Sequence, residues 1–168
     1  MILERGFKYK LTADEIELIK KMSADICSQD RSYFIDNFKR DKSTKLYNMN
    51  LNGFGAELAF CRLCDVIFDS STDKNKNHFN NPDAVLHNNI TVDVKTTVYK
   101  NGKLLVRKGK EEKRVDIYVL MVGEFPVFMY MGWADYDKII NPDTIINLGY
   151  GETYSMIQEK LNKALMYL

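Results

Sequence analysis

An aspartate and a lysine lie two positions apart in a segment whose alternating residues predict a β-strand. Asp93 and Lys95 flank Val94 within residues 90–97, which read Ile-Thr-Val-Asp-Val-Lys-Thr-Thr. Because successive side chains of a strand point to opposite faces, we expect Asp93 and Lys95 to share one face, about 6.6 Å apart. A carboxylate beside an ammonium group, with further carboxylates nearby, can hold a divalent cation over a phosphodiester.

A second carboxylate precedes this strand. Asp83 follows Pro82 and opens a short apolar strand candidate, 83–86, and a turn candidate, 87–89, leads into the next strand. With a three-residue loop, Asp83 faces Asp93 across an antiparallel ladder. Two facing carboxylates repel each other, and a bound cation would remove that cost. A two-residue loop would place Asp83 on the other face unless a bulge corrects it.

A third carboxylate occurs in a helical pattern. Residues 54–68 predict a helix with one apolar or thiol stripe that also contains Glu57. The stripe consists of Phe54, Glu57, Cys61, Cys64 and Phe68. A carboxylate in a buried stripe is costly unless it is paired or binds a metal. The alternative is an acid at the edge of the stripe that reaches solvent or a lysine.

The order of these residues resembles the PD-(D/E)xK phosphodiesterase superfamily, the restriction-endonuclease-like nucleases. The pattern of that superfamily is a helix-borne glutamate, an aspartate at the start of one strand, often after proline, and an acid-x-lysine on the next strand. Glu57, Pro82-Asp83 and Asp93-Val94-Lys95 match it in order. One departure is that the third acid is an aspartate, which is the less common choice and has a shorter reach.

This resemblance implies a fold and an activity. It covers about residues 50–133 and implies an α/β protein with a restriction-endonuclease-like core, a mixed central β-sheet flanked by helices. The core of that family continues with a helix and a further strand, for which residues 115–122 are suitable. The implied activity is metal-dependent hydrolysis of phosphodiester bonds.

The resemblance also implies a role for each site residue. Asp83 and Asp93 would ligate Mg²⁺, or Mn²⁺ as the alternative ion, because carboxylate oxygens suit these hard cations. The carbonyl of Val94 would be a further ligand, and Glu57 would bind or orient the metal and its waters. Lys95 would position or deprotonate the attacking water and stabilise the charge that develops on the phosphate.

We expect one nuclease-like domain, 1–168, with three consecutive parts. These are an N-terminal helical part (1–50), the catalytic core (51–133) and a C-terminal helical part (134–168). Within them the patterns predict helices at 13–28, 32–38, 136–140 and 155–167, polar connections at 39–50 and 70–81, and strands at 115–122 and 127–131. Asn101-Gly102 predicts a hairpin turn between Val98-Tyr99 and Leu104-Leu105.

Composition places the chain among globular proteins. Hydrophobic residues make up 45% of its 168 residues and charged residues 28%. The sequence has no run of 18 apolar residues and no signal-peptide pattern, so we expect a cytoplasmic protein with no membrane partner. The three cysteines form no disulfide framework and suit a reducing interior. Buried helix cysteines explain Cys61 and Cys64 better than a zinc site, which needs four ligands.

The basic residues are clustered, although the net charge is only +1. One run follows the strand of Lys95 and contains Arg107, Lys108, Lys110, Lys113 and Arg114. Residues 39–45 form a second basic stretch. Either stretch can contact nucleic-acid phosphates in a salt-dependent way, and a solvated surface is the alternative for each.

These observations predict a magnesium-dependent nuclease whose partner is nucleic acid, with DNA favoured over RNA. Small enzymes of this fold that act on branched or damaged DNA often form dimers, and a homodimer is left open. The alternative from another class is a non-catalytic module that binds nucleic acid or protein and retains the nuclease fold. The chain contains no GxxxxGK[ST] motif, which argues against ATP hydrolysis.

Overall fold

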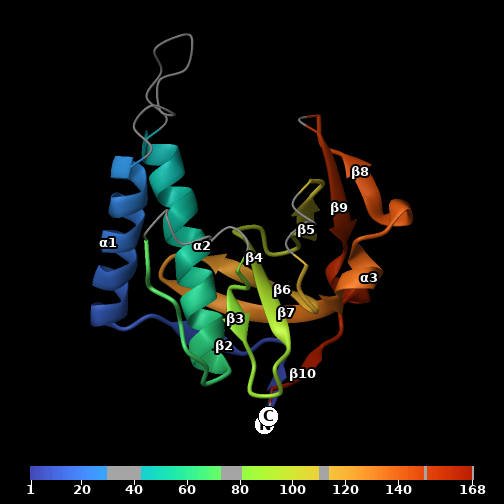
Figure 1. The fold of residues 1–168 in the computed structure, drawn as a ribbon, viewed down its shortest axis with the longest axis horizontal. Coiled ribbons are helices and arrows are strands. Elements are labelled where there is room, and N and C mark those ends of the chain that lie inside the picture. The colour runs from blue at the N-terminus through green and yellow to red at the C-terminus, as the bar shows by residue number, and fades with distance from the viewer. Residues whose placement is uncertain (30–42, 73–80, 110–113, 150, 168) are drawn as a thin grey trace.

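A five-stranded mixed sheet lies between two long helices on one face and a second sheet on the other (Figure 1). The computed structural model describes residues 1–29, 43–72, 81–109, 114–149 and 151–167. The helices are α1 (Ala13–Gln29), α2 (Ser43–Leu63) and the short α3 (Tyr136–Ile139), with 3₁₀ turns η2 (Pro142–Thr144) and η3 (Gln158–Lys160). The strands are β1 (Ile2–Glu4), β2 (Lys8–Lys10), β3 (Ala84–Val85), β4 (Thr91–Thr97), β5 (Leu104–Arg107), β6 (Ile117–Glu124), β7 (Val127–Asp135), β8 (Ile145–Asn147), β9 (Glu152–Met156) and β10 (Ala164–Met166).

The strands form three sheets. The central sheet has the order β2-β7-β6-β4-β3, the second sheet has the order β5-β9-β8, and β1 pairs with β10. Strand β4 runs parallel to β6, and the other pairs of the central sheet are antiparallel. The expectation of an α/β protein with a mixed sheet is confirmed at this level.

Strand β6 is the inner strand on which both layers pack. Its residues Ile117, Val119 and Met121 lie in the core under α1 and α2, and Tyr118, Leu120 and Val122 lie in the core under β5 and β9. A strand covered on both faces reads as a continuous apolar run, as Ile-Tyr-Val-Leu-Met-Val does here. The expected strand at 115–122 is therefore confirmed.

Helix α1 begins where the sequence predicts. The side-chain oxygen Oγ1 of Thr12 accepts from the backbone N–H of Glu15 (3.4 Å), and the Glu15 carboxylate accepts from the backbone N–H of Thr12 (3.0 Å). This reciprocal capping box satisfies two donors that the helix end would leave without partners. The Glu15 carboxylate also accepts hydrogen bonds from Arg62 Nε (2.7 Å) and Tyr9 Oη, so it joins α1 to α2 and β2.

Helix α2 is longer than the sequence predicts. The expected polar connection at 39–50 is wrong from Ser43 onward, because α2 begins there. The first turns of α2 pack beside α1, where Asn50 Nδ2 lies 3.8 Å from Cys27 Sγ and Leu46 and Tyr47 are half-buried. Packing against a partner helix stabilises these turns more than their own propensity does. The helix expected at 32–38 and most of the loop expected at 70–81 lie outside the described residues.

The C-terminal helix expected at 155–167 is wrong. This segment forms the end of β9, the turn η3 and strand β10, and it completes two different sheets. Met156 pairs with Leu104, and Leu165 pairs with Leu3. The apolar residues whose spacing suggested a helix instead pack singly into the two cores. Pairing with distant strands decides the structure of this segment more than its local pattern does. The part 134–168 is thus mainly strands and 3₁₀ turns among its described residues, and the N-terminal part contains β1 and β2 as well as helix.

The connection from β4 to β6 also differs from expectation. The predicted hairpin at Asn101-Gly102 is wrong, because β5 pairs with β9 and not with β4. In its described residues this connection contains β5 where the resemblance implied a helix. Within the parts of the chain that the structure covers, no helix is both long and apolar enough to cross a membrane.

We predict that the Glu15 carboxylate stabilises the fold above its titration range. Burial raises the pKa of Glu15, but the hydrogen bonds from Arg62, Thr12 and Tyr9 outweigh burial and hold the pKa below its ordinary value of 4.5. A lowered folded-state pKa gives stability that is present above pH 4.5 and is lost as the pH falls through the lowered value. Glu15→Gln should therefore lower the free energy of unfolding by about 1 kcal/mol at pH 7 and by less at pH 3.

Urea unfolding at both pH values measures this difference. Glu17→Gln is the matched control, because Glu17 lies in the same helix and forms an exposed pair with Lys20. Such exposed pairs contribute little. An equal loss of stability for Glu15→Gln at pH 3 and pH 7 would contradict the role of the ionised Glu15 carboxylate.

Candidate active site

The hairpin of β3 and β4 fixes the positions of the two aspartates. Leu86 donates its N–H to Ile90 O (2.9 Å), and Asn89, at φ 64°, donates its N–H to Leu86 O (2.8 Å). The loop therefore has three residues, with the last one in the left-handed conformation that asparagine tolerates. The resulting register pairs Ala84 with Val92, as the sequence predicted for this loop length.

Asp93 and Lys95 lie on the same face of β4, as their spacing predicted. Lys95 Nζ lies 2.6 Å from Asp93 Oδ2. Asp93 is 5% exposed, and the side chain of Lys95 is 32% exposed. Val92 and Val94 point to the opposite face and belong to the core under α2. The energetic cost of burying the Asp93 carboxylate is thus offset by the Lys95 ammonium group, which still reaches solvent.

Asp83 completes the end of the ladder with its side chain. Its backbone N–H donates to Val92 O (2.9 Å), and its Oδ2 accepts from the N–H of Val94 (2.7 Å). Because the N–H and C=O of one strand residue point to the same edge, the Val94 carbonyl also lies on the Asp83 side. Each carboxylate has its own donor, Val94 N–H for Asp83 and Lys95 for Asp93, and these donors offset part of the cost of placing two acids at this end of the ladder.

Glu57 approaches this hairpin from α2, which packs on β4. Glu57 is half-buried one turn before Cys61. Burial, followed by the negative charges of Glu57 and Asp83, raises the pKa of the Cys61 thiol to about 12. Both carboxylates thus act electrostatically on the Cys61 thiol. Cys61 and Cys64 are buried free thiols, as expected.

These residues have donor atoms that suit a metal ion, but they do not form a complete set of ligands around one point. The three acids supply carboxylate oxygens, and Val94 supplies a carbonyl oxygen, which suit Mg²⁺ or Mn²⁺. Across the described residues, no three His, Cys, Asp or Glu side chains lie close enough together to hold a metal ion. In this arrangement the Lys95 ammonium is a counter-ion for Asp93.

Two tyrosines that the sequence did not single out lie beside Lys95. Lys95 Nζ is 6.0 Å from the centroid of the Tyr118 ring, and Tyr118 stacks on Tyr136 with 6.2 Å between centroids. Arg114 Cζ lies 5.7 Å from the centroid of Tyr136, so a cation faces each end of the stack. The register pairs Asp93 with Tyr118, but that pairing could be found only after β6 is known to neighbour β4.

The predicted nucleic-acid-binding run is described in part. Arg107 is exposed at the end of β5, and Lys108 Nζ lies 2.6 Å from Glu152 Oε2 in an exposed ion pair. Arg114 is exposed and packs over Tyr136. Lys110 and Lys113 lie outside the described residues. Glu152 offsets part of the positive charge of Lys108. Because both side chains are exposed, the pair itself contributes little to stability.

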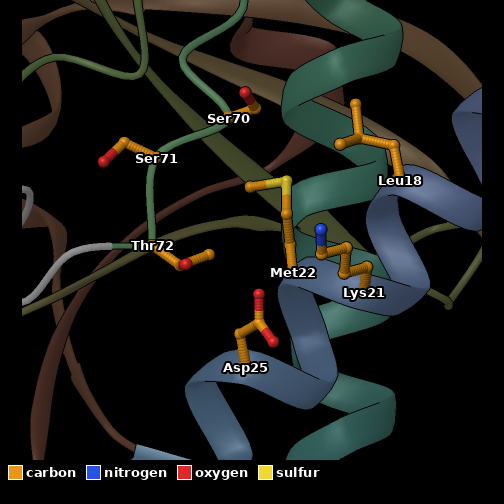
Figure 2. A pocket seen from close by; sticks show the side chains of 7 residues that line it. All are labelled: Leu18, Lys21, Met22, Asp25, Ser70, Ser71 and Thr72. Atoms are coloured by element: carbon orange, nitrogen blue, oxygen red, sulfur yellow. The ribbon is translucent and has the colours of Figure 1, made fainter.

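A separate cavity of about 450 Å³ lies between α1 and the segment after α2 (Figure 2). None of the predicted site residues lines it. Figure 2 shows the α1 side chains facing Ser70, Ser71 and Thr72 across the cavity. The lining consists of Leu18, Lys21, Met22, Asp25, Ser70, Ser71 and Thr72.

Comparison with known families assigns the chain to one of them. Residues 3–137 match a family of unknown function, DUF5843, and the protein belongs to this family. The match covers both long helices and the whole central sheet, including every residue of the candidate site. No curated protein and no solved structure matches the chain.

We predict that Lys95 stabilises the fold through Asp93. Lys95→Ala removes the ammonium group from a carboxylate that is 5% exposed, and the free energy of unfolding should fall by about 1–3 kcal/mol. Lys138→Ala is the matched control, because it breaks a pair with Asp135 of similar length, 2.8 Å, in which both side chains are exposed. This control should cost less than about 0.5 kcal/mol. Equal losses for both variants in chemical denaturation would show that Asp93 does not depend on Lys95.

Proposed function

We propose that this protein is a metal-dependent nuclease that hydrolyses phosphodiester bonds, with DNA as the favoured substrate. The observation that carries the proposal is the ion pair of Asp93 and Lys95 on an inner strand, beside an aspartate that bonds to the backbone between them. Their order and spacing fit the aspartate and the acid-x-lysine of the PD-(D/E)xK pattern, which supports the proposal.

The order of elements supports a restriction-endonuclease-like core. Helix α2 is followed by the hairpin β3–β4 and by β6, which lies parallel to β4 and next to it. One difference is the connection from β4 to β6, which contains β5. Strand β5 covers the face of the sheet opposite to α2.

The residues would divide the chemistry among them. A bound Mg²⁺ or Mn²⁺ would lower the pKa of a water and offset charge on the scissile phosphate. Asp83, Asp93 and the Val94 carbonyl supply the oxygens that would hold the ion. Glu57, to which the resemblance gives a role in binding or orienting the metal and its waters, lies on α2, which covers the face of β4 opposite to Asp93 and Lys95. Lys95, whose ammonium group reaches solvent, would bond to a phosphate oxygen and stabilise its developing charge. The Lys95 ammonium group is at the same time the counter-ion of Asp93.

The rival proposal is a non-catalytic module that binds nucleic acid or protein on the same fold. The half-buried Glu57 and the buried Asp93 favour catalysis, because a surface that only binds phosphates gains nothing from carboxylates. The free thiols of Cys27, Cys61 and Cys64 favour a reducing compartment, and we propose the cell interior as its location.

We predict that cleavage requires a divalent cation together with Asp93 and Lys95. Asp93→Asn and Lys95→Ala should each lower the turnover of a DNA substrate in Mg²⁺ by about 10²-fold or more, since each removes a charge placed for the transition state. Gel analysis of labelled single-stranded, duplex and branched DNA and of RNA measures this. Lys138→Ala is the control that should keep full turnover.

The same assay separates the rival proposal. Binding without cleavage by the native protein in Mg²⁺ and in Mn²⁺ would support the non-catalytic module. Undiminished cleavage in excess EDTA would exclude the metal mechanism. Calorimetric titration with Mn²⁺ provides a readout apart from activity, in which Asp93→Asn should weaken ion binding about tenfold or more.

We predict that the basic run contributes to affinity more than to turnover. Arg107 and Lys108 are exposed just beyond the strand that follows Lys95, where they can contact phosphates that flank the site. Replacing Arg107, Lys108 and Lys110 with alanine should weaken binding and lower the slope of log affinity against log salt by about 2–3. Turnover at saturating substrate should change less than about twofold. Identical salt slopes for the native protein and the variant would exclude this run from the DNA path.

A further inference from the structure

The turn between β4 and β5 exposes an aromatic ring close to Lys95. This turn, residues 98–103, joins the central sheet to the second sheet (Figure 1). Tyr99 is 74% exposed and its neighbour Val98 is 49% exposed. Tyr99 lies four positions after Lys95, so their Cα atoms lie at most about 14 Å apart. That distance corresponds to about four stacked nucleotides along one strand.

The turn is held in one conformation by specific hydrogen bonds. Tyr99 donates its N–H to Thr97 Oγ1 (3.3 Å), and Gly102 donates its N–H to Tyr99 O (2.8 Å). Gln158, which is 9% exposed, donates from Nε2 to the carbonyls of Lys100 (2.9 Å) and Gly102 (2.8 Å). The buried side chain of Gln158 thus fixes the backbone of the turn at Lys100 and Gly102, directly after Tyr99.

Gly102 shows how tightly the turn is closed. A Cβ atom at this position would lie 2.4 Å from Thr97 Cγ2, so the turn permits no side chain there without a shift. Because its backbone is fixed by these contacts, Tyr99 is presented to solvent by a rigid support. A rigid aromatic group offers contact area at a low cost in conformational entropy.

Basic residues accompany Tyr99 in the turn and in the adjoining η3. Lys100, Lys103 and Lys160 are exposed, and η3 also contains the exposed acid Glu159. A positive surface with an exposed aromatic ring is the combination that binds single strands, where lysines contact phosphates and the ring stacks on a base. In a duplex both faces of each base are already covered by its neighbours, so such a ring needs an unpaired base.

We propose that Tyr99 stacks on an unpaired base of the nucleic-acid substrate, with Lys100 and Lys103 contacting the adjacent phosphates. This inference rests on the proposed nuclease function and specifies its substrate class. The strand to be cut then includes a single-stranded portion within a few nucleotides of the scissile phosphate. A fully paired duplex lacks this contact.

Binding experiments with the Asp93→Asn protein test the inference without cleavage. The probes are a fluorescent 12-nucleotide single strand and the 12-base-pair duplex of the same sequence, and the readout is anisotropy. Adding Tyr99→Ala should weaken binding of the single strand about tenfold, because the stack between the ring and one base is lost. Adding Tyr99→Phe should retain affinity within about twofold, since the ring remains. Duplex affinity should change less than about twofold in both variants.

Phe7→Ala is the matched control, because Phe7 is also an exposed aromatic residue (53%) but lies next to β2, at the other edge of the central sheet from β3. It should leave both affinities unchanged. Single-strand binding that is unaffected by Tyr99→Ala would overturn the inference, as would an equal loss for the duplex. If native protein nevertheless cleaves nucleic acid in Mg²⁺, the proposed function stands while this inference fails. Native protein that neither binds nor cleaves any nucleic acid would overturn both.

Discussion

The buried carboxylate of Asp93 sets the requirement that organises its surroundings. An ionised group that is 5% exposed needs a charged or polar partner, and Lys95 meets that need from the same face of β4. The aromatic ring of Tyr118 on the neighbouring strand lies under the ammonium group. Asp116 ties the starts of β4 and β6 together by accepting from the N–H (2.8 Å) and the hydroxyl (2.6 Å) of Thr91. The site therefore depends on the parallel pair β4–β6 as much as on its own residues.

The parts of the fold that sequence predicted are those determined locally. The start of α1 follows from a hydrogen-bonded exchange between residues three positions apart, and the β3–β4 register follows from a three-residue loop. The pairing of Asp93 with Lys95 needs only the alternation of a strand. The C-terminal strands were not predictable in this way, because Leu165 is held by Leu3 at the other end of the chain. Strand propensity depends on such partners more than on the segment itself.

In the candidate site, too, the residues that local spacing determines were predicted, and those that depend on distant segments were not. Glu57, Asp83, Asp93 and Lys95 were singled out from residue type and spacing, and the structure pairs Asp93 with Lys95 and joins Asp83 to the backbone of Val94. Tyr118 and Tyr136 were not found, since their position depends on β6 lying next to β4 and on α3 following β7. The rigid support of the Tyr99 turn comes from Gln158, 56 residues beyond Gly102. No local pattern connects those two segments.

The pairing of β1 with β10 has a consequence for the order of folding during synthesis. Leu3 and Leu165 are both nearly fully buried and lie opposite each other, and Figure 1 shows the two chain ends side by side. As the ribosome releases the chain from its N-terminus, β1 has no partner strand until residues 164–166 emerge. The central sheet can close earlier, once β7 is available to β2. Until residues 164–166 have been synthesised, the side chain of Leu3 therefore lacks the strand partner that helps to bury it in the folded protein.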